Sequence, residues 1–151
     1  MAIEAPISRY KKTNFKIYII VCFVLALWFT YDGYLNQSFI KEHTNEDGTA
    51  NPTLIFNQKS PPVFAAAAVL LSVYFLSFKN KKLLAAENEL ILSNKKIPYD
   101  TIQKIDKTHF DSKGRFTITY NQNNRQYDYT FSSLKYDNLE EILNHLVAKI
   151  S

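Results

Sequence analysis

Two long uncharged blocks constrain this chain more than any other feature of its sequence. Residues 17–31 (IYIIVCFVLALWFTY) and 60–78 (SPPVFAAAAVLLSVYFLSF) contain no Asp, Glu, Lys or Arg. A helix rises about 1.5 Å per residue, so the second block spans about 28 Å, close to the roughly 30 Å of a bilayer core. The first block reaches that length when it is extended to 15–35, with Lys16 snorkelling to the interface. We therefore predict transmembrane helices at about 15–35 and 60–79, joined by a loop at 36–59.

The composition of both blocks favours insertion into a bilayer. Each of Ile17–Tyr31 and Val63–Phe78 holds nine Leu, Ile, Val or Phe residues, which together contribute about −3 to −5 kcal/mol per helix. A buried helical hairpin of a soluble protein is the alternative, but such helices usually keep a polar face, and neither block has one. A cleaved signal peptide would need small residues after its apolar core. Here Trp28 and Phe29 follow instead, so we expect the first helix to be retained.

The flanking cations predict the orientation of the two helices. Seven Lys or Arg residues precede the first uncharged block or follow the second: Arg9, Lys11, Lys12, Lys16, Lys79, Lys81 and Lys82. The connecting loop holds only Lys41 and Lys59, together with several carboxylates. The positive-inside rule then puts both termini in the cytoplasm and the loop outside. The polar loop carries a turn signal at Asp47-Gly48 and a possible short strand at Thr53–Phe56, and Pro61-Pro62 is expected to start the second helix.

From Leu83 onward the sequence changes to short alternating runs separated by polar turns. The clearest are Arg115–Tyr120 and Gln126–Phe131, in which three apolar residues alternate with polar ones, as in a hairpin with one apolar face. Four further strands are expected at Leu83–Ala86, Glu89–Ser93, Ile97–Tyr99 and Thr101–Lys107.

The last segment changes to helical spacing. Its apolar stripe consists of Leu139, Ile142, Leu143, Leu146, Val147 and Ile150. Asp137, with Glu140 three residues later, is similar to a capping box at the start of this helix. A sheet and a helix that each have one apolar face can cover one another. The predicted fold is therefore α+β: a tail and transmembrane hairpin at 1–82, then a small antiparallel sheet closed by a C-terminal helix at 83–151.

The order of these strands resembles a known family. Glu89–Ser93 (ELILS), then Lys96–Asp106 (KIPYDTIQKID), in meander order before a closing amphipathic helix, are similar to bacterial pleckstrin-homology-like (PH-like) domains. The most specific part is Ile97–Ile105 (IPYDTIQKI), where the family has a polar turn before a strand. Such domains often follow a pair of transmembrane helices in small bacterial membrane proteins. The resemblance covers 83–151 and the anchor, and it implies a cytoplasmic PH-like half-barrel on the bacterial inner membrane.

Few residues in the sequence favour catalysis or cofactor binding. His43, His109 and His145 are far apart, and His43 is expected on the opposite side of the membrane, so they do not form one metal site. His145 is expected on the surface of the C-terminal helix, and Cys22 lies within the first membrane block without a base nearby. Asp100, Asp106 and Asp111 can pair as acid and base, but carboxylates near turns are more often caps. We expect no enzyme activity, metal or cofactor.

Two features remain as candidate binding surfaces. A basic cluster would face the anionic inner leaflet, or simply set the topology: Lys11, Lys12, Lys79, Lys81 and Lys82. Small residues at near-helical spacing favour close helix packing in lipid: Ala65, Ala68 and Ser72. From Lys79 onward, 12 basic and 9 acidic residues give only +3, and three of the 12 belong to the basic cluster, so nucleic-acid binding is not expected.

The sequence therefore predicts a non-enzymatic two-pass membrane protein. Its cytoplasmic domain is expected to act as an interaction or scaffold module, as in an accessory subunit of a larger membrane assembly. The expected partners are the lipid bilayer and other membrane or cytoplasmic proteins. The alternative is a sensor that reads anionic lipid headgroups or another ligand at the membrane surface.

Overall fold

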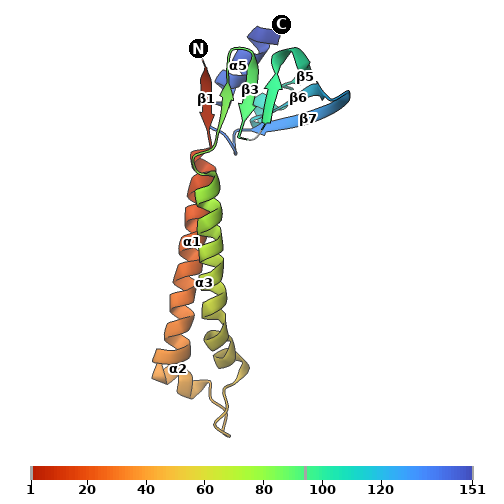
Figure 1. The fold of residues 1–151 in the computed structure, drawn as a ribbon. Coiled ribbons are helices and arrows are strands. Elements are labelled where there is room, and N and C mark those ends of the chain that lie inside the picture. Colours follow the sequence, from red (N-terminus) through yellow and green to blue (C-terminus); the bar gives the residue numbers. More distant parts are fainter. Residues whose placement is uncertain (1, 94, 151) are drawn as a thin grey trace. The chain divides into compact units, whose positions relative to one another are not determined.

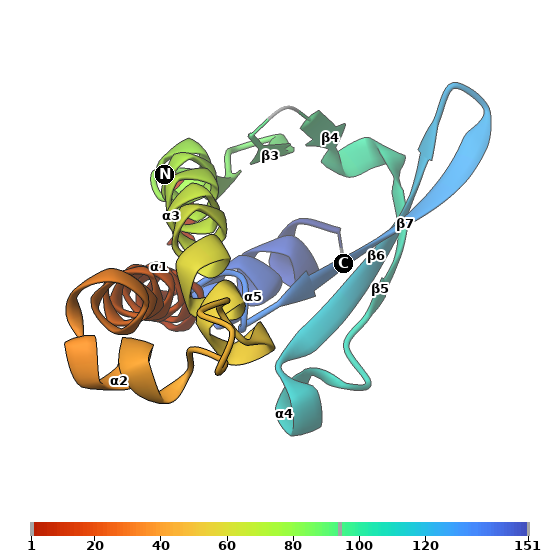
Figure 2. The same ribbon diagram turned by 90° about the horizontal axis from the view of Figure 1, so that it is seen from below.

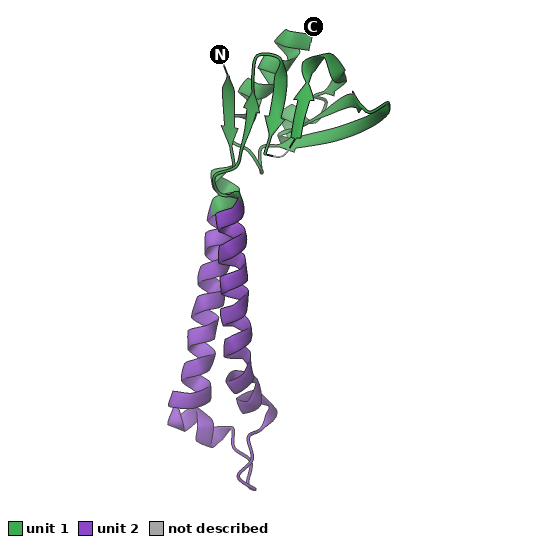
Figure 3. Cartoon of the chain, viewed as in Figure 1, with its two compact units in different colours: residues 1–12, 78–151 green, residues 13–77 purple. Residues whose placement is uncertain are grey.

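The computed structural model describes residues 2–93 and 95–150. The chain divides into two compact units, which Figure 3 shows in different colours. Residues 13–77 form one unit, called here the helical unit, and residues 1–12 with 78–151 form the other, called here the domain. The domain therefore combines both ends of the sequence, which differs from the predicted division at residue 82.

Two long helices dominate the helical unit and lie side by side (Figure 1). Helix α1 (Arg9–Thr30) continues into a short π-helical segment, η1 (Tyr31–Leu35), and α3 (Pro52–Phe78) returns along it. Each is long and apolar enough to cross a membrane. Between them lies only the short helix α2 (Gln37–Glu42) and a turn at Gly48, whose φ of 85° requires the left-handed region that glycine adopts easily. The two predicted apolar helices are confirmed, and the predicted turn at Asp47-Gly48 is present.

Helix α3 is longer than the sequence predicts. It begins at Pro52, so Thr53–Phe56 is helical and not a strand, and Pro61 and Pro62 lie inside the helix and do not start it. A proline inside a helix leaves the carbonyl four residues earlier without its N–H donor. For Pro62 that carbonyl belongs to Gln58, and the Tyr34 hydroxyl donates a hydrogen bond to it at 2.8 Å. The neighbouring helix thus supplies the missing donor.

The segment η1 also packs closely against α3 near the connection between the two long helices. A Cβ on Gly33 would lie 2.9 Å from the carbonyl carbon and oxygen of Asn57, so only glycine allows the two backbones to approach this closely. The Gln58 side chain also donates to the Gly33 carbonyl at 3.1 Å. Next to this contact, the Phe29 ring packs against Phe56 and Phe64, with centroids 5.4 and 5.5 Å away.

The described residues of the domain form two antiparallel sheets and not the single sheet that we predict from the sequence. The first has the order β1-β2-β3-β4, and the second has the order β5-β6-β7. Two short helical pieces, η2 (Tyr99–Thr101) and α4 (Phe110–Lys113), and the C-terminal helix α5 (Leu139–Ile150) complete it. The strands are β1 (Ile3–Pro6), β2 (Lys82–Ala85), β3 (Glu89–Leu92), β4 (Lys95–Pro98), β5 (Ile102–Asp106), β6 (Arg115–Gln122) and β7 (Arg125–Ser132).

Strand β1 is the main departure from the sequence analysis, which treated residues 1–14 as a tail. It pairs with β2, the strand that follows α3, with Ile3 opposite Ala85 and Ala5 opposite Leu83. Ala5 and Leu83 are both fully buried. The helical pair is thus inserted between the first and second strands of one sheet, and α1 begins at Arg9, immediately after β1 and its bridge residue Ile7.

The second sheet confirms the predicted hairpin and lengthens it. Strands β6 and β7 pair along eight residues each, through a two-residue turn at Asn123-Asn124 with φ of 53° and 58°. Positive φ at both central positions is the requirement of a type I′ turn, which asparagine tolerates well. Figure 2 shows the hairpin projecting away from the rest of the domain. Its apolar face is buried along β6, but on β7 only Phe131 is buried, and Tyr127 is 41% exposed.

Helix α5 supplies the other half of the core. Its predicted stripe is buried at Leu139, Ile142, Leu143 and Leu146. The helix packs against β1, β2 and η2. In the α+β class, with two long apolar helices, antiparallel strands and a C-terminal helix, the structure agrees with the prediction.

Candidate functional site

The five lysines of the predicted basic cluster all lie in the domain. They belong to two segments, 7–12, where β1 leads into α1, and 78–82, where α3 leads into β2; we call these segments together the neck. Strand pairing holds the two segments together, because Pro6 lies opposite Lys82 at the end of the β1–β2 ladder. Residues separated by about half of the chain thus form one local cluster of cations.

A third segment, residues 134–136, is hydrogen-bonded to the N-terminal part of the neck. The Ser8 hydroxyl donates to the Leu134 carbonyl at 2.6 Å, and the Ser8 N–H donates to the Lys135 carbonyl at 2.9 Å. On the other side, the Ile7 N–H donates to the Lys81 carbonyl at 3.2 Å. Ser8 is buried, so breaking these bonds would leave unpaired polar groups in the interior.

The predicted capping box at α5 is wrong. The Asp137 carboxylate accepts a hydrogen bond from the Arg9 N–H at 3.1 Å, at the start of α1, while Ser8 Oγ accepts from the Lys11 N–H at 3.2 Å. Both oxygens satisfy N–H groups of the first turn, which have no partner within the helix. A carboxylate is also favourable there because of the helix dipole. Asp137 therefore caps a helix that begins 128 residues earlier in the chain.

The neck lysines differ in how free their ammonium groups are. Lys82 forms an ion pair with Glu4, and Lys11 lies over the Phe78 ring with its nitrogen 4.6 Å from the centroid. Lys81 is exposed, and Lys12 and Lys79 are half-buried. Glu4 thus neutralises part of the cluster, and the neck keeps an excess of positive charge suited to an anionic surface.

The small-residue stripe on α3 is not uniformly packed. Ala68 is buried, Ala65 is exposed, and the Ser72 hydroxyl donates to the Ala68 carbonyl at 2.7 Å. A further close approach, at Gly33 and Asn57, is not among the predicted packing residues. The GxxxG-like spacing that signals such contacts is absent around Gly33, so the sequence offered little to find it.

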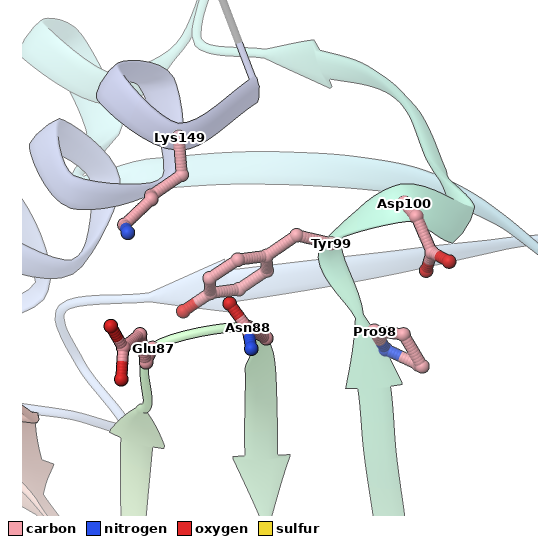
Figure 4. Close-up of a pocket in the computed structure, with 6 residues that line it drawn as sticks. All are labelled: Glu87, Asn88, Pro98, Tyr99, Asp100 and Lys149. Atoms are coloured by element: carbon pink, nitrogen blue, oxygen red, sulfur yellow. The ribbon is translucent and has the colours of Figure 1, made fainter.

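Figure 4 shows a separate open pocket of about 400 Å³ in the domain. Its lining comes from the β2–β3 turn, from the end of β4 with η2, and from the end of α5: Glu87, Asn88, Pro98, Tyr99, Asp100 and Lys149. The Tyr99 hydroxyl donates to the Ala86 carbonyl at 2.8 Å, so it is a structural group here. His145, expected on the surface, is half-buried, with its ring in edge contact with that of Tyr99.

Burial raises the pKa of Tyr99 to about 12, with the nearby Glu89 carboxylate as a smaller cause. Because the folded-state pKa lies above the ordinary value of 10.0, stability is fully present below pH 10 and is lost as the pH rises through about 12. Thermal unfolding of the full chain in detergent should therefore show falling stability in this window. Tyr99→Phe should reduce that alkaline loss, and should cost about 1 kcal/mol at neutral pH through the missing hydrogen bond.

Tyr136, whose pKa burial also raises, contributes to the same alkaline loss, so Tyr99→Phe should reduce the loss without removing it. Tyr10→Phe, at an exposed tyrosine, is the matched control and should leave the alkaline loss in place. An alkaline profile of Tyr99→Phe that matches the wild-type profile would contradict the role of this hydroxyl.

The three histidines lie at separate places. His43 stacks on Phe39 in the helical unit, His109 precedes α4, and His145 lies in α5. Within residues 2–93 and 95–150, no three His, Cys, Asp or Glu side chains are grouped closely enough to hold a metal ion. Asp100, Asp106 and Asp111 lie in η2, β5 and α4, and no hydrogen bond between them is found in this part of the chain.

Comparisons of the chain with family models, with curated proteins and with solved structures gave no match. The feature of the site that sequence reasoning missed is the strand before α1. A signal for it exists, because Ile3, Ala5 and Ile7 alternate with Glu4 and Pro6, as in a short half-buried strand. The bonds of Ser8 and Asp137 carry no such signal, since their partners are distant in sequence.

Proposed function

We propose that this chain is a non-enzymatic two-pass membrane protein of the bacterial inner membrane, with a cytoplasmic PH-like domain that acts as an interaction or scaffold module. The main support for this proposal is the chain order, in which the helical pair is inserted between strands β1 and β2 of one sheet. Only the connection between β1 and β2 would then attach the domain to the membrane. The other loops and the β6–β7 hairpin remain available to a partner, such as another subunit of a membrane assembly.

The strand arrangement supports the PH-like part of the proposal. Four strands, then three strands, then a C-terminal helix follow the meander order that the sequence resemblance implies. Strand β1 adds a segment from before the first helix and raises the number of strands in the described residues to seven.

The surface of the helical unit supports the membrane part. Large apolar side chains are exposed along both long helices, among them Phe23, Leu27 and Trp28 on α1 and Val69 and Leu70 on α3. Contiguous exposed apolar surface of this kind is costly in water and favourable in lipid. The pairing of Pro6 with Lys82 also supports an even number of crossings, because both ends of the helical pair must lie on one side to join one sheet.

The β6–β7 hairpin is the surface that best suits a protein partner. Residues 121–128 are all exposed, and β7 is an edge strand in the described part of the chain. Edge strands present unpaired backbone groups to which an extended segment can add. The exposed Tyr127 ring stacks on Tyr120 at 5.9 Å and offers a preorganised aromatic contact.

A lipid sensor is the second candidate, favoured by the gathering of five lysines at the neck. The two functions respond differently to salt, because charges at a membrane surface are screened over about 8 Å at physiological ionic strength. Extraction of the full chain from native membranes in mild detergent, followed by sizing at low and high salt, separates them. A scaffold predicts a complex larger than the chain that survives high salt.

Two substitutions sharpen this test. Tyr127→Lys should dissociate the complex, whereas Ala148→Lys, which adds the same charge at an exposed position of α5, should not. Lys79, Lys81 and Lys82 replaced together by Gln should leave the complex intact. If instead the triple variant loses bound anionic lipid while no salt-resistant complex forms in the wild type, the lipid sensor replaces the scaffold.

A further inference from the structure

The outer face of the second sheet carries a polar pocket separate from the neck. Its floor is one row across three strands, because Asp106 of β5 lies opposite Thr117 of β6, which lies opposite Thr130 of β7. The two threonine hydroxyls are 2.8 Å apart and bond to each other. One hydroxyl must donate and the other accept, so one O–H of the pair remains free to donate to a ligand.

Three basic side chains form the wall of the pocket. His109 precedes α4, Lys113 ends it, and Arg115 begins β6. Gly114 between them has a φ of 59°, and a Cβ there would overlap Ser133 Oγ, so the turn that brings Lys113 and Arg115 to the same pocket requires glycine. The pocket has a volume of about 220 Å³.

The charges of the pocket are unbalanced. Asp106 is its one acidic group among the lining residues, and its Oδ1 already accepts from the Thr108 N–H and hydroxyl, at 3.0 and 2.6 Å. These bonds lower the pKa of Asp106. Among the described residues, its Oδ2 has no hydrogen-bond partner and can accept from a ligand. In the described residues, the side chains of Lys113 and Arg115 have no ion-pair or hydrogen-bond partner. Basic and hydroxyl donors therefore outnumber the single carboxylate among the lining residues.

We propose that this pocket binds a phosphomonoester. The guanidinium of Arg115, the ammonium of Lys113 and the free threonine O–H match the three oxygens of a phosphate, and Arg binds phosphate through two parallel hydrogen bonds. A carboxylate ligand has only two oxygens for these donors. Asp106 Oδ2 would accept from a hydroxyl group on the ester side of the ligand, which disfavours a bare phosphodiester chain. The phosphate belongs either to a free metabolite or to a lipid headgroup.

The histidines provide a direct readout. The chain has three, so full-length protein in detergent that is labelled at histidine nitrogen gives few NMR signals, and His109→Asn assigns the one from the pocket. Titration with inorganic phosphate, against chloride at equal ionic strength, should shift the His109 signal in a saturable way. The His43 and His145 signals should stay unchanged.

Matched variants test the cations. Lys113→Gln and Arg115→Gln should each weaken phosphate binding about 10-fold, the usual size of a lost charge-assisted hydrogen bond. Lys107→Gln, next to Asp106 but outside this pocket, and Arg125→Gln, at the far end of the same hairpin, should bind as the wild type does. All four side chains are exposed, so these variants are expected to fold.

The same NMR measurement in lipid nanodiscs distinguishes a lipid headgroup from a free metabolite as the source of the phosphate. Phosphatidylcholine nanodiscs with phosphatidic acid should produce the His109 shift without added phosphate if the ligand is a lipid headgroup. If it is a free metabolite, the shift should appear only when phosphate is added. No saturable shift in either arm, or an equal shift in Arg115→Gln and Arg125→Gln, would overturn the proposal.

Discussion

Replacing Ala5 with Asp is expected to abolish cooperative unfolding of the domain. Ala5 is fully buried in β1, opposite the fully buried Leu83 of β2. Burying a carboxylate without a partner costs several kcal/mol. The total stability of a small domain is about 5–15 kcal/mol, and a domain of this size lies near the lower end. One charge in the N-terminal segment should therefore unfold strands that lie far along the chain.

Amide hydrogen–deuterium exchange of β6 and β7 in the full-length protein measures this effect. In Ala5→Asp, the exchange protection of these strands should be lost, although they are more than 100 residues away. Ala2→Asp, which adds the same charge at an exposed position before β1, is the control and should keep the protection. Protected β6 and β7 amides in Ala5→Asp would mean that β1 is dispensable for the domain.

The elements that could be predicted from the sequence are those with enough residues to show a period. Strand β6 shows its alternation over Phe116, Ile118 and Tyr120, all of which are buried, and α5 shows its stripe over three turns. Strand β1 has only four residues, so its alternation is short, and its partner β2 lies beyond the helical pair, where no local pattern points to it. The sequence does not separate the two sheets, because the alternation of β4 and β5 does not reveal that these neighbouring strands fail to pair.

The start of α3 was predicted wrongly for a different reason. Two consecutive prolines usually start a helix, and Pro61-Pro62 was interpreted in that way. Inside a helix, prolines are tolerated where a neighbouring group replaces the lost donor. For Pro62 that group is the hydroxyl of Tyr34, 24 residues before the Gln58 carbonyl that it satisfies, so the exception depends on tertiary structure.

In the candidate site, too, local features could be predicted from the sequence, whereas contacts between distant residues could not. The sequence was sufficient to name the five lysines, because charge next to an apolar block is a local signal. It was not sufficient to predict the hydrogen bonds that join the neck to the segment near the C-terminus. An Asp at position 137 can cap any helix start that lies near it, and in the folded chain its carboxylate accepts from the Arg9 N–H of α1. The pocket around Arg115 was not predicted either, since its residues come from three strands and a short helix.

Cysteine labelling at three positions is expected to give an all-or-none result. In a Cys22→Ser background, single cysteines replace Glu46 in the loop, Ala2 before β1 and Ala148 in α5, all at exposed positions. Both termini are predicted on the cytoplasmic side, because seven flanking cations oppose two in the loop and because β1 pairs with β2 across the helical pair. An impermeant thiol reagent added to intact cells should reach only position 46.

This labelling pattern tests the central claim, a domain interrupted by a two-pass membrane hairpin, most directly. Positions 2 and 148 should react together, and only after the cells are permeabilised, whereas position 46 should react before. Labelling of position 2 and position 148 from opposite sides would contradict it, because strand β1 would then be separated from β2 by the membrane.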